Sequence, residues 1–364
     1  MSAPSSIADE HASRGSDLLA VLVGAMVGGV GTLFREAARR GYALFAATLS
    51  AADARGIPGW IPGALGGAAL VGAAALLTSR FSGESAGSGI QEIEGMLAGK
   101  RPNLRWRRVL PVKFVGGLLG ISAGLLLGRE GPTIHMGGAI GAAVAEQRRA
   151  GRDRLRLLVA AGSAAGLAVA FGAPLAGILF SLEELRREFP PTRTVIRAVA
   201  LAAITAVLIG IAISGSGRIL PVAPLAAPSL PALGLTIPFA AAVALVGLLF
   251  NAALLKALEA GRVIARRAGR LSLPAAAGAG LGALVWIFHD ATGGGEDLAQ
   301  KLLTSSSALV VLAALLVARF VLFDVSYATA IPGGIFAPQL ALGTILGLLF
   351  AAGTGRLAPG LSLT

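Results

Sequence analysis

The chain has 364 residues, of which 55% are hydrophobic and only 14% charged, and its mean hydropathy is +0.77. Soluble domains carry about 25% charged residues, so this composition excludes an ordinary soluble protein. With no cysteine and only three histidines, the sequence excludes disulfides and thiolate metal sites, and we expect neither a metal ion nor a cofactor. The 51 glycines predict helices that pack closely in lipid.

The net charge of +12 is concentrated in short segments. Twenty of the 31 basic residues lie in four stretches, 100–113, 146–156, 183–197 and 256–270. Lys and Arg in short loops are typical of the cytoplasmic face of a membrane protein. No basic stretch contains interleaved aromatic residues, so we expect the lipid bilayer as a partner and no nucleic acid.

Residues 1–17 are polar and lack the basic region and cleavage site of a signal peptide, which predicts a cytoplasmic N-terminal segment. Most of the uncharged runs that follow approach the length of about 20 residues that a spanning helix needs. These runs are 18–34, 56–79, 114–128, 131–145, 157–182, 198–217, 219–255, 271–289, 302–318 and 325–355. None alternates like a strand, so the predicted fold is an all-α polytopic membrane protein.

Two of these runs, 114–128 and 131–145, have only 15 residues each, which is about 22 Å of helix. A hydrocarbon core is about 30 Å thick, and basic stretches flank the pair on both sides. The pair is therefore predicted to be a hairpin that returns to the cytoplasmic face. Its turn, 128–132, is expected within the membrane or near its outer edge.

Three further breaks interrupt apolar sequence. Phe171-Gly172-Ala173-Pro174 predicts a new short helix from Pro174 to Glu183-Glu184, because proline is tolerated in a first helical turn. Another break spans 331–338, and Gly87-Ser88-Gly89 opens a short segment that ends near Leu97. Irregular backbone at membrane depth needs protein or water around it, and helix N-termini attract anions. The breaks therefore predict a central anion site.

Glu130 is the main candidate for chemistry, because carboxylates within a bilayer are costly and usually functional. Ionised, it can occupy an anion site itself; protonated, it can leave and admit an anion. The alternative is an Arg129–Glu130 ion pair in an outer loop.

Other polar residues have weaker interpretations. Glu183 and Glu184 end a short apolar helix and, taken alone, are better read as a solvated end paired with Arg186 and Arg187. Ser88 can donate to an anion or cap a helix, and both roles can hold together. No catalytic motif has its expected context, so an enzyme is not expected.

Three motifs together resemble the CLC family of chloride channels and chloride/proton exchangers. They are Gly87-Ser88-Gly89-Ile90, Gly128-Arg129-Glu130-Gly131-Pro132 and Gly334-Ile335-Phe336-Ala337-Pro338. Gln91 departs from the first motif, where the family often has proline. The resemblance implies an inverted-repeat bundle of tilted and broken helices, with residues 18–217 as the first membrane repeat and 218–364 as a partial second one.

The resemblance also implies roles for individual residues. Ser88 would bind chloride through its hydroxyl, the backbone N–H groups of Ile335 and Phe336 would bind it from the opposite side, and Glu130 would be the gate. Glu184 matches the inner proton-transfer glutamate of exchangers. A chloride/proton exchanger in the inner (plasma) membrane is therefore expected; the alternatives are a passive voltage- or pH-gated chloride channel and a truncated, non-transporting membrane protein.

The sequence stops 26 residues after Pro338, although the second half of the family continues well beyond this motif. We therefore expect an incomplete second repeat that lacks a later tyrosine of the anion site. A homodimer is expected if the missing helices are present.

Overall fold

The computed structural model describes residues 7–184, 192–215, 233–305 and 307–357. Thirteen α-helices and two 3-10 turns, and no strand, make up the regular structure of these residues. The first part of the chain contains α1 (Ile7–Asp53), α2 (Trp60–Phe81), η1 (Gly83–Ser85), α3 (Ile90–Leu97), α4 (Trp106–Ser122), α5 (Glu130–Gln147), α6 (Arg152–Phe171), α7 (Pro174–Glu184) and α8 (Arg193–Ser214). The second part contains α10 (Thr236–Ala268), α11 (Ser272–Ile287), η2 (His289–Ala291), α12 (Glu296–Thr304), α13 (Leu309–Ala328) and α14 (Phe336–Leu357).

Seven helices among the described residues are long and apolar enough to cross a membrane: α1, α2, α6, α8, α10, α13 and α14. Large apolar side chains face outward on several of them, such as Leu208 on α8, Leu248 on α10 and Val310 on α13. A water-soluble protein rarely exposes so much contiguous apolar surface, whereas a bilayer accepts it. The chain is thus a multi-pass, all-helical membrane protein, as its composition predicts.

Glycine contacts bring the central helices together. α5 packs on α6, and a Cβ added to Gly137 would lie 2.1 Å from the carbonyl oxygen of Gly162. α2 packs on α11 in the same way, since a Cβ on Gly67 would lie 2.0 Å from the carbonyl oxygen of Gly278. Backbones that approach this closely leave no room for a side chain, which explains much of the glycine content.

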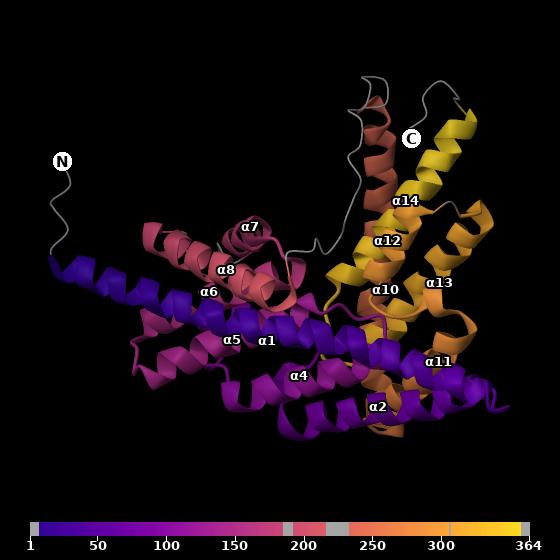
Figure 1. Cartoon of the computed structure of the whole chain (residues 1–364), viewed down its shortest axis with the longest axis horizontal. Helices are drawn as coiled ribbons and strands as arrows, with labels where there is room; N and C mark the ends of the chain where they lie inside the picture. The colour runs from indigo at the N-terminus through magenta and orange to yellow at the C-terminus, as the bar shows by residue number, and fades with distance from the viewer. Residues whose placement is uncertain (1–6, 185–191, 216–232, 306, 358–364) are drawn as a thin grey trace.

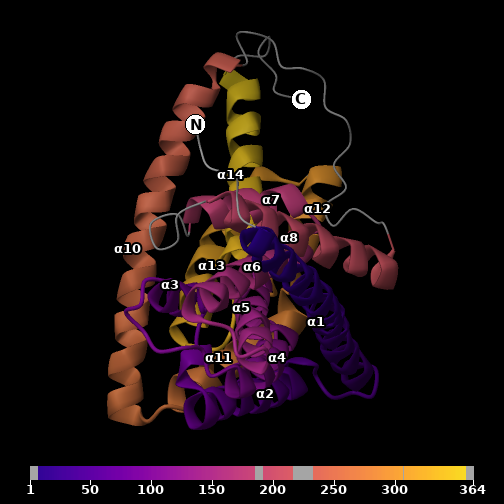
Figure 2. The ribbon, with the colours of Figure 1, turned by 90° about the vertical axis from the view of Figure 1, so that its left-hand side faces the viewer.

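The helices differ in how deeply they lie in the bundle. In Figure 1, α1 and α8 run side by side along one part of the molecule, and α5 and α6 lie beneath them. Figure 2 shows α10 and α14 rising together beyond the rest of the bundle. Every residue of α5 from Glu130 to Ala145 is buried, so this helix and the break that precedes it lie in the protein core.

Two helices are longer than their uncharged runs predict. α1 extends from Ile7 to Asp53 rather than over 18–34, and its charged half contains the pairs Glu36–Arg39 (2.7 Å) and Glu36–Arg40 (2.9 Å). Ion pairs at this spacing stabilise a helix, so charge alone does not end it. The repeat boundary expected at 217/218 lies outside the described residues.

α4 begins at Trp106 rather than at 114, and it takes in part of the basic stretch. Lys113 lies within α4 and is fully buried, with Nζ donating to the carbonyl oxygens of Ser85 (3.0 Å) and Gly87 (2.7 Å). The buried ammonium therefore has carbonyl partners. By contrast, the short helices predicted at Ile90 and Pro174 are confirmed in α3 and α7.

Candidate functional site: a central anion site

Three of the predicted breaks meet at one point in the core. The break before α5 and the break before α14 form an antiparallel bridge, in which Gly128 N donates to Gly334 O (2.8 Å) and Gly334 N donates to Gly128 O (2.7 Å). Gly333 N in turn donates to Gly87 O (2.9 Å) in the break before α3. Backbone hydrogen bonds thus join the three motifs directly.

Close backbone contact at this junction requires glycine. A Cβ on Gly131 would lie 2.9 Å from the Cα atoms of both Gly334 and Ser88. Gly87 and Gly89 have φ angles of +58° and +82°, a region that favours glycine. The glycines in these motifs therefore let three chain segments converge closely around one small space.

The Glu130 carboxylate lies in that space. The residue is 0% exposed, and its Oε1 accepts a hydrogen bond of 2.9 Å from Ala337 N in the first turn of α14. The backbone N–H groups of Glu130 itself and of Phe336 also stabilise the ionised carboxylate. The side chain thus lies at the N-termini of α5 and α14, where free N–H groups and helix dipoles favour negative charge. Its Oε2 is buried with no hydrogen-bond partner among the described residues.

The alternative of an Arg129–Glu130 ion pair is wrong. Arg129 instead forms an ion pair with Glu296, the first residue of α12. The Arg129 side chain is only 14% exposed and the Glu296 side chain 17%, so this pair also lies mostly within the protein.

Pro132 and Pro338 occupy equivalent positions. Each is the third residue of its helix, α5 or α14, where a missing N–H costs no helical hydrogen bond. Ile335 and Phe336 stand at the start of α14, and Phe336 contacts the ring of Phe180 in α7 (centroids 5.5 Å apart). The two breaks therefore have the same local design, and α7 contacts the second one.

Ser88 lies beside the same junction and is 3% exposed. Its hydroxyl donates to Gln91 Oε1 (3.1 Å) and accepts from Ile90 N (3.4 Å), while Gly89 occupies the N-cap position of α3. The prediction that Ser88 is the N-cap of α3 is therefore wrong, because Gly89 takes that position, although the Ser88 hydroxyl still accepts from the first N–H of the helix.

Sequence reasoning assigned no role to Tyr327, the residue whose hydroxyl contacts Ser88. Tyr327 lies at the end of α13, is 8% exposed, and its Oη accepts a hydrogen bond from Ser88 N (3.3 Å). Its place just before a break is the only sequence signal. His135, one turn into α5, is fully buried against Gly89, and neither ring nitrogen has a hydrogen-bond partner among the described residues.

The predicted inner glutamate lies apart from this junction. Glu184 is the last residue of α7 and is exposed, as is Glu183. Arg186 and Arg187, their expected partners, lie outside the described residues. Glu184 shares α7 with Phe180, and the Phe180 ring contacts Phe336 at the junction.

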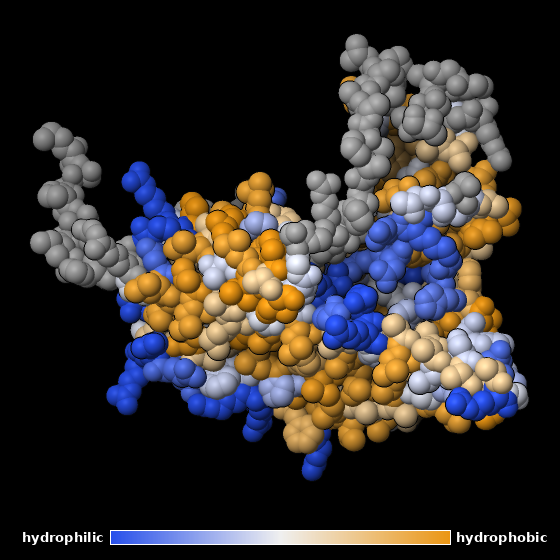
Figure 3. Space-filling view, viewed as in Figure 1, coloured by the Kyte–Doolittle hydropathy of each residue, from blue (hydrophilic) through white to orange (hydrophobic). Residues whose placement is uncertain are grey.

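A cavity of about 330 Å³ adjoins the junction. Gly128, Arg129 and Ala337 contribute to its wall next to Glu130. Figure 3 shows hydrophilic residues gathered around α12 on a mostly apolar face. The cavity thus reaches Gly128 and Ala337, which contact the buried Glu130 carboxylate.

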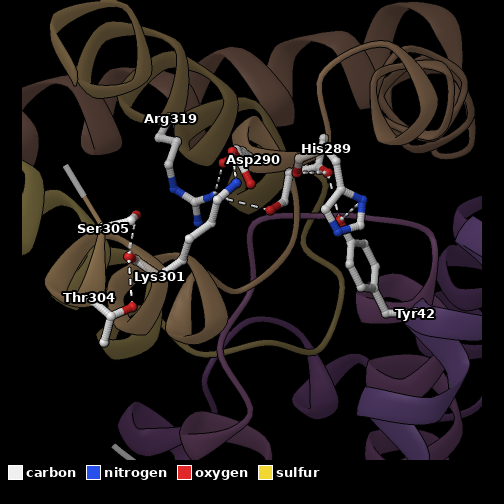
Figure 4. A network of polar contacts seen from close by, with 8 residues as sticks. Tyr42, His289, Asp290, Lys301, Thr304, Ser305 and Arg319 are labelled. Atoms are coloured by element: carbon white, nitrogen blue, oxygen red, sulfur yellow. Dashed lines mark hydrogen bonds and ion pairs between the residues drawn. The ribbon is translucent and has the colours of Figure 1, made fainter. Parts of the chain in front are cut away.

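Figure 4 shows the hydrogen-bond network that supports this cavity. Buried Arg319 donates to the carbonyl oxygens of Asp290 (3.1 Å), Thr292 (3.0 Å) and Gly293 (2.9 Å). Lys301 pairs with the Asp290 carboxylate at 2.6 Å. These contacts hold the loop before α12, and with it Glu296, in place.

An apolar multi-pass bundle whose broken helices direct their N-termini at one buried carboxylate is the architecture of a membrane transport protein. A family model described as voltage gated chloride channel matches residues 66–364. The chain belongs to this family, the CLC family, as its motifs predict.

Individual relatives agree with the family assignment. The H(+)/Cl(-) exchange transporter ClcA of Vibrio parahaemolyticus is 37% identical over 368 residues, which cover 99% of this chain and 79% of the relative. The ClcA of Vibrio vulnificus is 38% identical over 348 residues, or 95% of this chain and 74% of the relative. Among solved structures, a slow cyanobacterial Cl-/H+ antiporter superposes with a TM-score of 0.90 at 31% identity, covering 95% of this chain and 81% of that one. A CLC-type fluoride/proton antiporter shares the fold at a TM-score of 0.73 and 20% identity, over 96% of this chain and 84% of that one.

Proposed function

We propose that this protein exchanges chloride for protons across the membrane, with Glu130 as the gate. The observation that carries the proposal is the position of the Glu130 carboxylate, which accepts a hydrogen bond from Ala337 N at the start of α14. A carboxylate in that position takes the place of a bound anion. The relatives that are named as proton/chloride exchangers support the same function.

The mechanism follows from the two protonation states of one side chain. Ionised Glu130 binds at the two helix N-termini and excludes chloride. Protonation removes the charge that these N-termini attract, so the side chain leaves. Chloride then binds to the N–H groups of Ile335 and Phe336 and to the hydroxyl of Ser88. Because the proton and the anion take turns at one site, their movements are coupled.

Glu184 supplies the proton from the inner side in this proposal. It ends α7 beside the basic segment 183–197, and α7 contacts the anion site through Phe180 and Phe336. The basic residues in 146–156, at the far end of α5, support a cytoplasmic orientation of that end and of the N-terminus. The host membrane in this proposal is the inner (plasma) membrane.

We also propose that the two motifs 128–132 and 334–338 are equivalent parts of two inverted repeats. Each has glycine first and proline fifth, each precedes a helix, and the two glycines pair antiparallel. An antiparallel bridge is the relation expected of two breaks that enter the membrane from opposite sides.

Reconstitution of the purified chain into liposomes, with chloride and pH electrodes, tests the function. An outward chloride gradient should drive protons inward against their own gradient, and that movement should collapse when the chloride gradient is removed. Chloride flux without proton movement would replace the exchanger with a passive channel. The absence of both fluxes would refute transport by this chain.

A further inference from the structure

The gate has a second carboxylate close to it. Glu296 begins α12 and lines the cavity that reaches Gly128 and Ala337, the backbone neighbours of the Glu130 carboxylate. Arg129, the N-cap residue of α5, connects the two acidic residues: it precedes Glu130 in the chain and forms an ion pair with Glu296. Its guanidinium thus pairs with one of two mostly buried carboxylates and belongs to the chain neighbour of the other.

Arg129 retains hydrogen-bonding capacity that Glu296 does not use. Its Nε is buried and has no hydrogen-bond partner among the described residues, and the same is true of Glu130 Oε2. The charge of Arg129 also acts on Glu130. If Arg129 lost Glu296 as a partner, the unpartnered Oε2 of its chain neighbour Glu130 would therefore be available to it.

Burial of Glu296, modified by the charges around it, favours proton uptake close to neutral pH. Burial raises the pKa of Glu296 to about 7, the Arg129 guanidinium opposes this rise, and the Glu130 carboxylate adds to it. Asp297 on α12 also raises this pKa, and Arg35 on α1 lowers it. Because the Glu130 charge acts on Glu296, proton uptake by the two carboxylates is coupled.

The other charged groups of the cavity have partners of their own. Lys301 of α12 pairs with Asp290 of η2, and Arg319 of α13 donates to backbone carbonyls. Tyr42 of α1 contacts the ring of His289 (centroids 5.1 Å apart). Figure 4 shows these groups as one network. The charged groups that act on Glu296 are therefore Arg129, Glu130, Asp297 and Arg35.

We propose that Glu296 and Glu130 share one proton across Arg129, so that Glu296 is a positioning residue that raises the pH at which the gate takes up its proton. This inference rests on the proposed gating role of Glu130. With both carboxylates ionised, Arg129 cannot neutralise the pair, so one proton binds readily. Without the Glu296 charge, Arg129 balances Glu130 alone, and the gate takes up its proton only in more acidic solution.

The substitution Glu296→Gln tests this, because it removes the charge and keeps the shape. The pH at half-maximal coupled transport should fall by about one unit. Glu146→Gln is the matched control: it removes one negative charge from an exposed side chain at the opposite end of α5, and should move the midpoint by no more than about 0.3 unit. Glu296→Asp, which keeps the charge, should retain the midpoint of the unsubstituted protein to within about half a unit.

A second readout does not depend on transport. The infrared C=O stretch of the protonated Glu130, identified as the band lost in Glu130→Gln, can be titrated in detergent. Its midpoint should move down with Glu296→Gln by the same amount as the transport midpoint. Arg35→Gln removes a neighbouring positive charge and should move both midpoints up, by about half a unit.

The outcomes separate this inference from the proposed function. If the protein transports but neither midpoint moves with Glu296→Gln, the shared proton is refuted. If Glu296→Gln fails to fold, the shared proton is refuted when neither midpoint rises with Arg35→Gln. A protein that shows no coupled flux but a shifted Glu130 band would refute the exchange function and support the shared proton.

Discussion

Replacing Glu130 by glutamine is the most direct perturbation of the gate. Glutamine has the shape of a permanently neutral Glu130, so the variant should pass chloride and lose its coupling to protons. The reason is that the amide cannot bind and release the proton on which exchange depends. It also lacks the charge that the helix N-termini attract.

The structure supplies the expected magnitude. The Glu130 carboxylate is fully buried and accepts a hydrogen bond of 2.9 Å from Ala337 N. Hydrogen bonds to charged groups contribute about 1.5–3 kcal/mol and neutral ones about 0.5–1.5 kcal/mol. Glutamine should therefore compete with chloride less well by about 1–2 kcal/mol. The apparent Kd of chloride should fall by about fivefold to thirtyfold.

Two assays measure these effects. Liposomes with chloride and pH electrodes give the ratio of the two fluxes, and isothermal titration calorimetry in detergent gives the chloride affinity. Glu146→Gln is the matched control, because Glu146 lies at the opposite end of α5, where it is exposed and pairs with Arg107. It should change neither quantity. Proton pumping by Glu130→Gln at the level of the unsubstituted protein would refute the gating argument, and so would an unchanged chloride affinity.

The remaining predictions concern the inner carboxylate, the tyrosine and the packing of the motifs. Glu184→Gln should abolish proton movement while chloride still flows, whereas Glu183→Gln should do far less; equal effects in flux assays would refute the assignment. Tyr327→Phe removes the hydroxyl that accepts a hydrogen bond from the buried backbone N–H of Ser88. The free energy of unfolding should fall by about 1–3 kcal/mol, and saturating chloride should recover part of that loss. Thermal unfolding in detergent measures both effects, and an unchanged melting temperature would count against the hydrogen bond. Gly131→Ala places a methyl group 2.9 Å from the backbone of both other motifs and should abolish chloride binding in calorimetry, whereas Gly72→Ala, with open space around it, should not.

The local design of this protein was predictable from its sequence. The apolar runs and the few charges indicated a helical membrane protein, because a bilayer accepts only apolar segments whose backbone is internally hydrogen-bonded. The helix starts near Ile90 and Pro174, and the break before Phe336, followed from glycine and proline, which act within a few residues of their own position. Apolar length was a poorer guide to helix ends in α1 and α4. In α1, ion pairs within the helix stabilise charged residues that lie beyond the uncharged run. In α4, carbonyl oxygens of the segment before α3 do the same for Lys113.

The partners of the charged and polar groups were decided by the tertiary structure. Arg129 lies next to Glu130 in sequence, yet it pairs with Glu296, 167 residues further on. Ser88 meets Tyr327, and Gly128 meets Gly334, across similar separations. Short-range preferences cannot specify such contacts, because they form only when the packed helices bring distant breaks to one point. The physical reason is that a helix start depends on the conformation of a few neighbouring residues, whereas the electrostatics of a buried carboxylate depend on every dipole and charge that the whole bundle places around it.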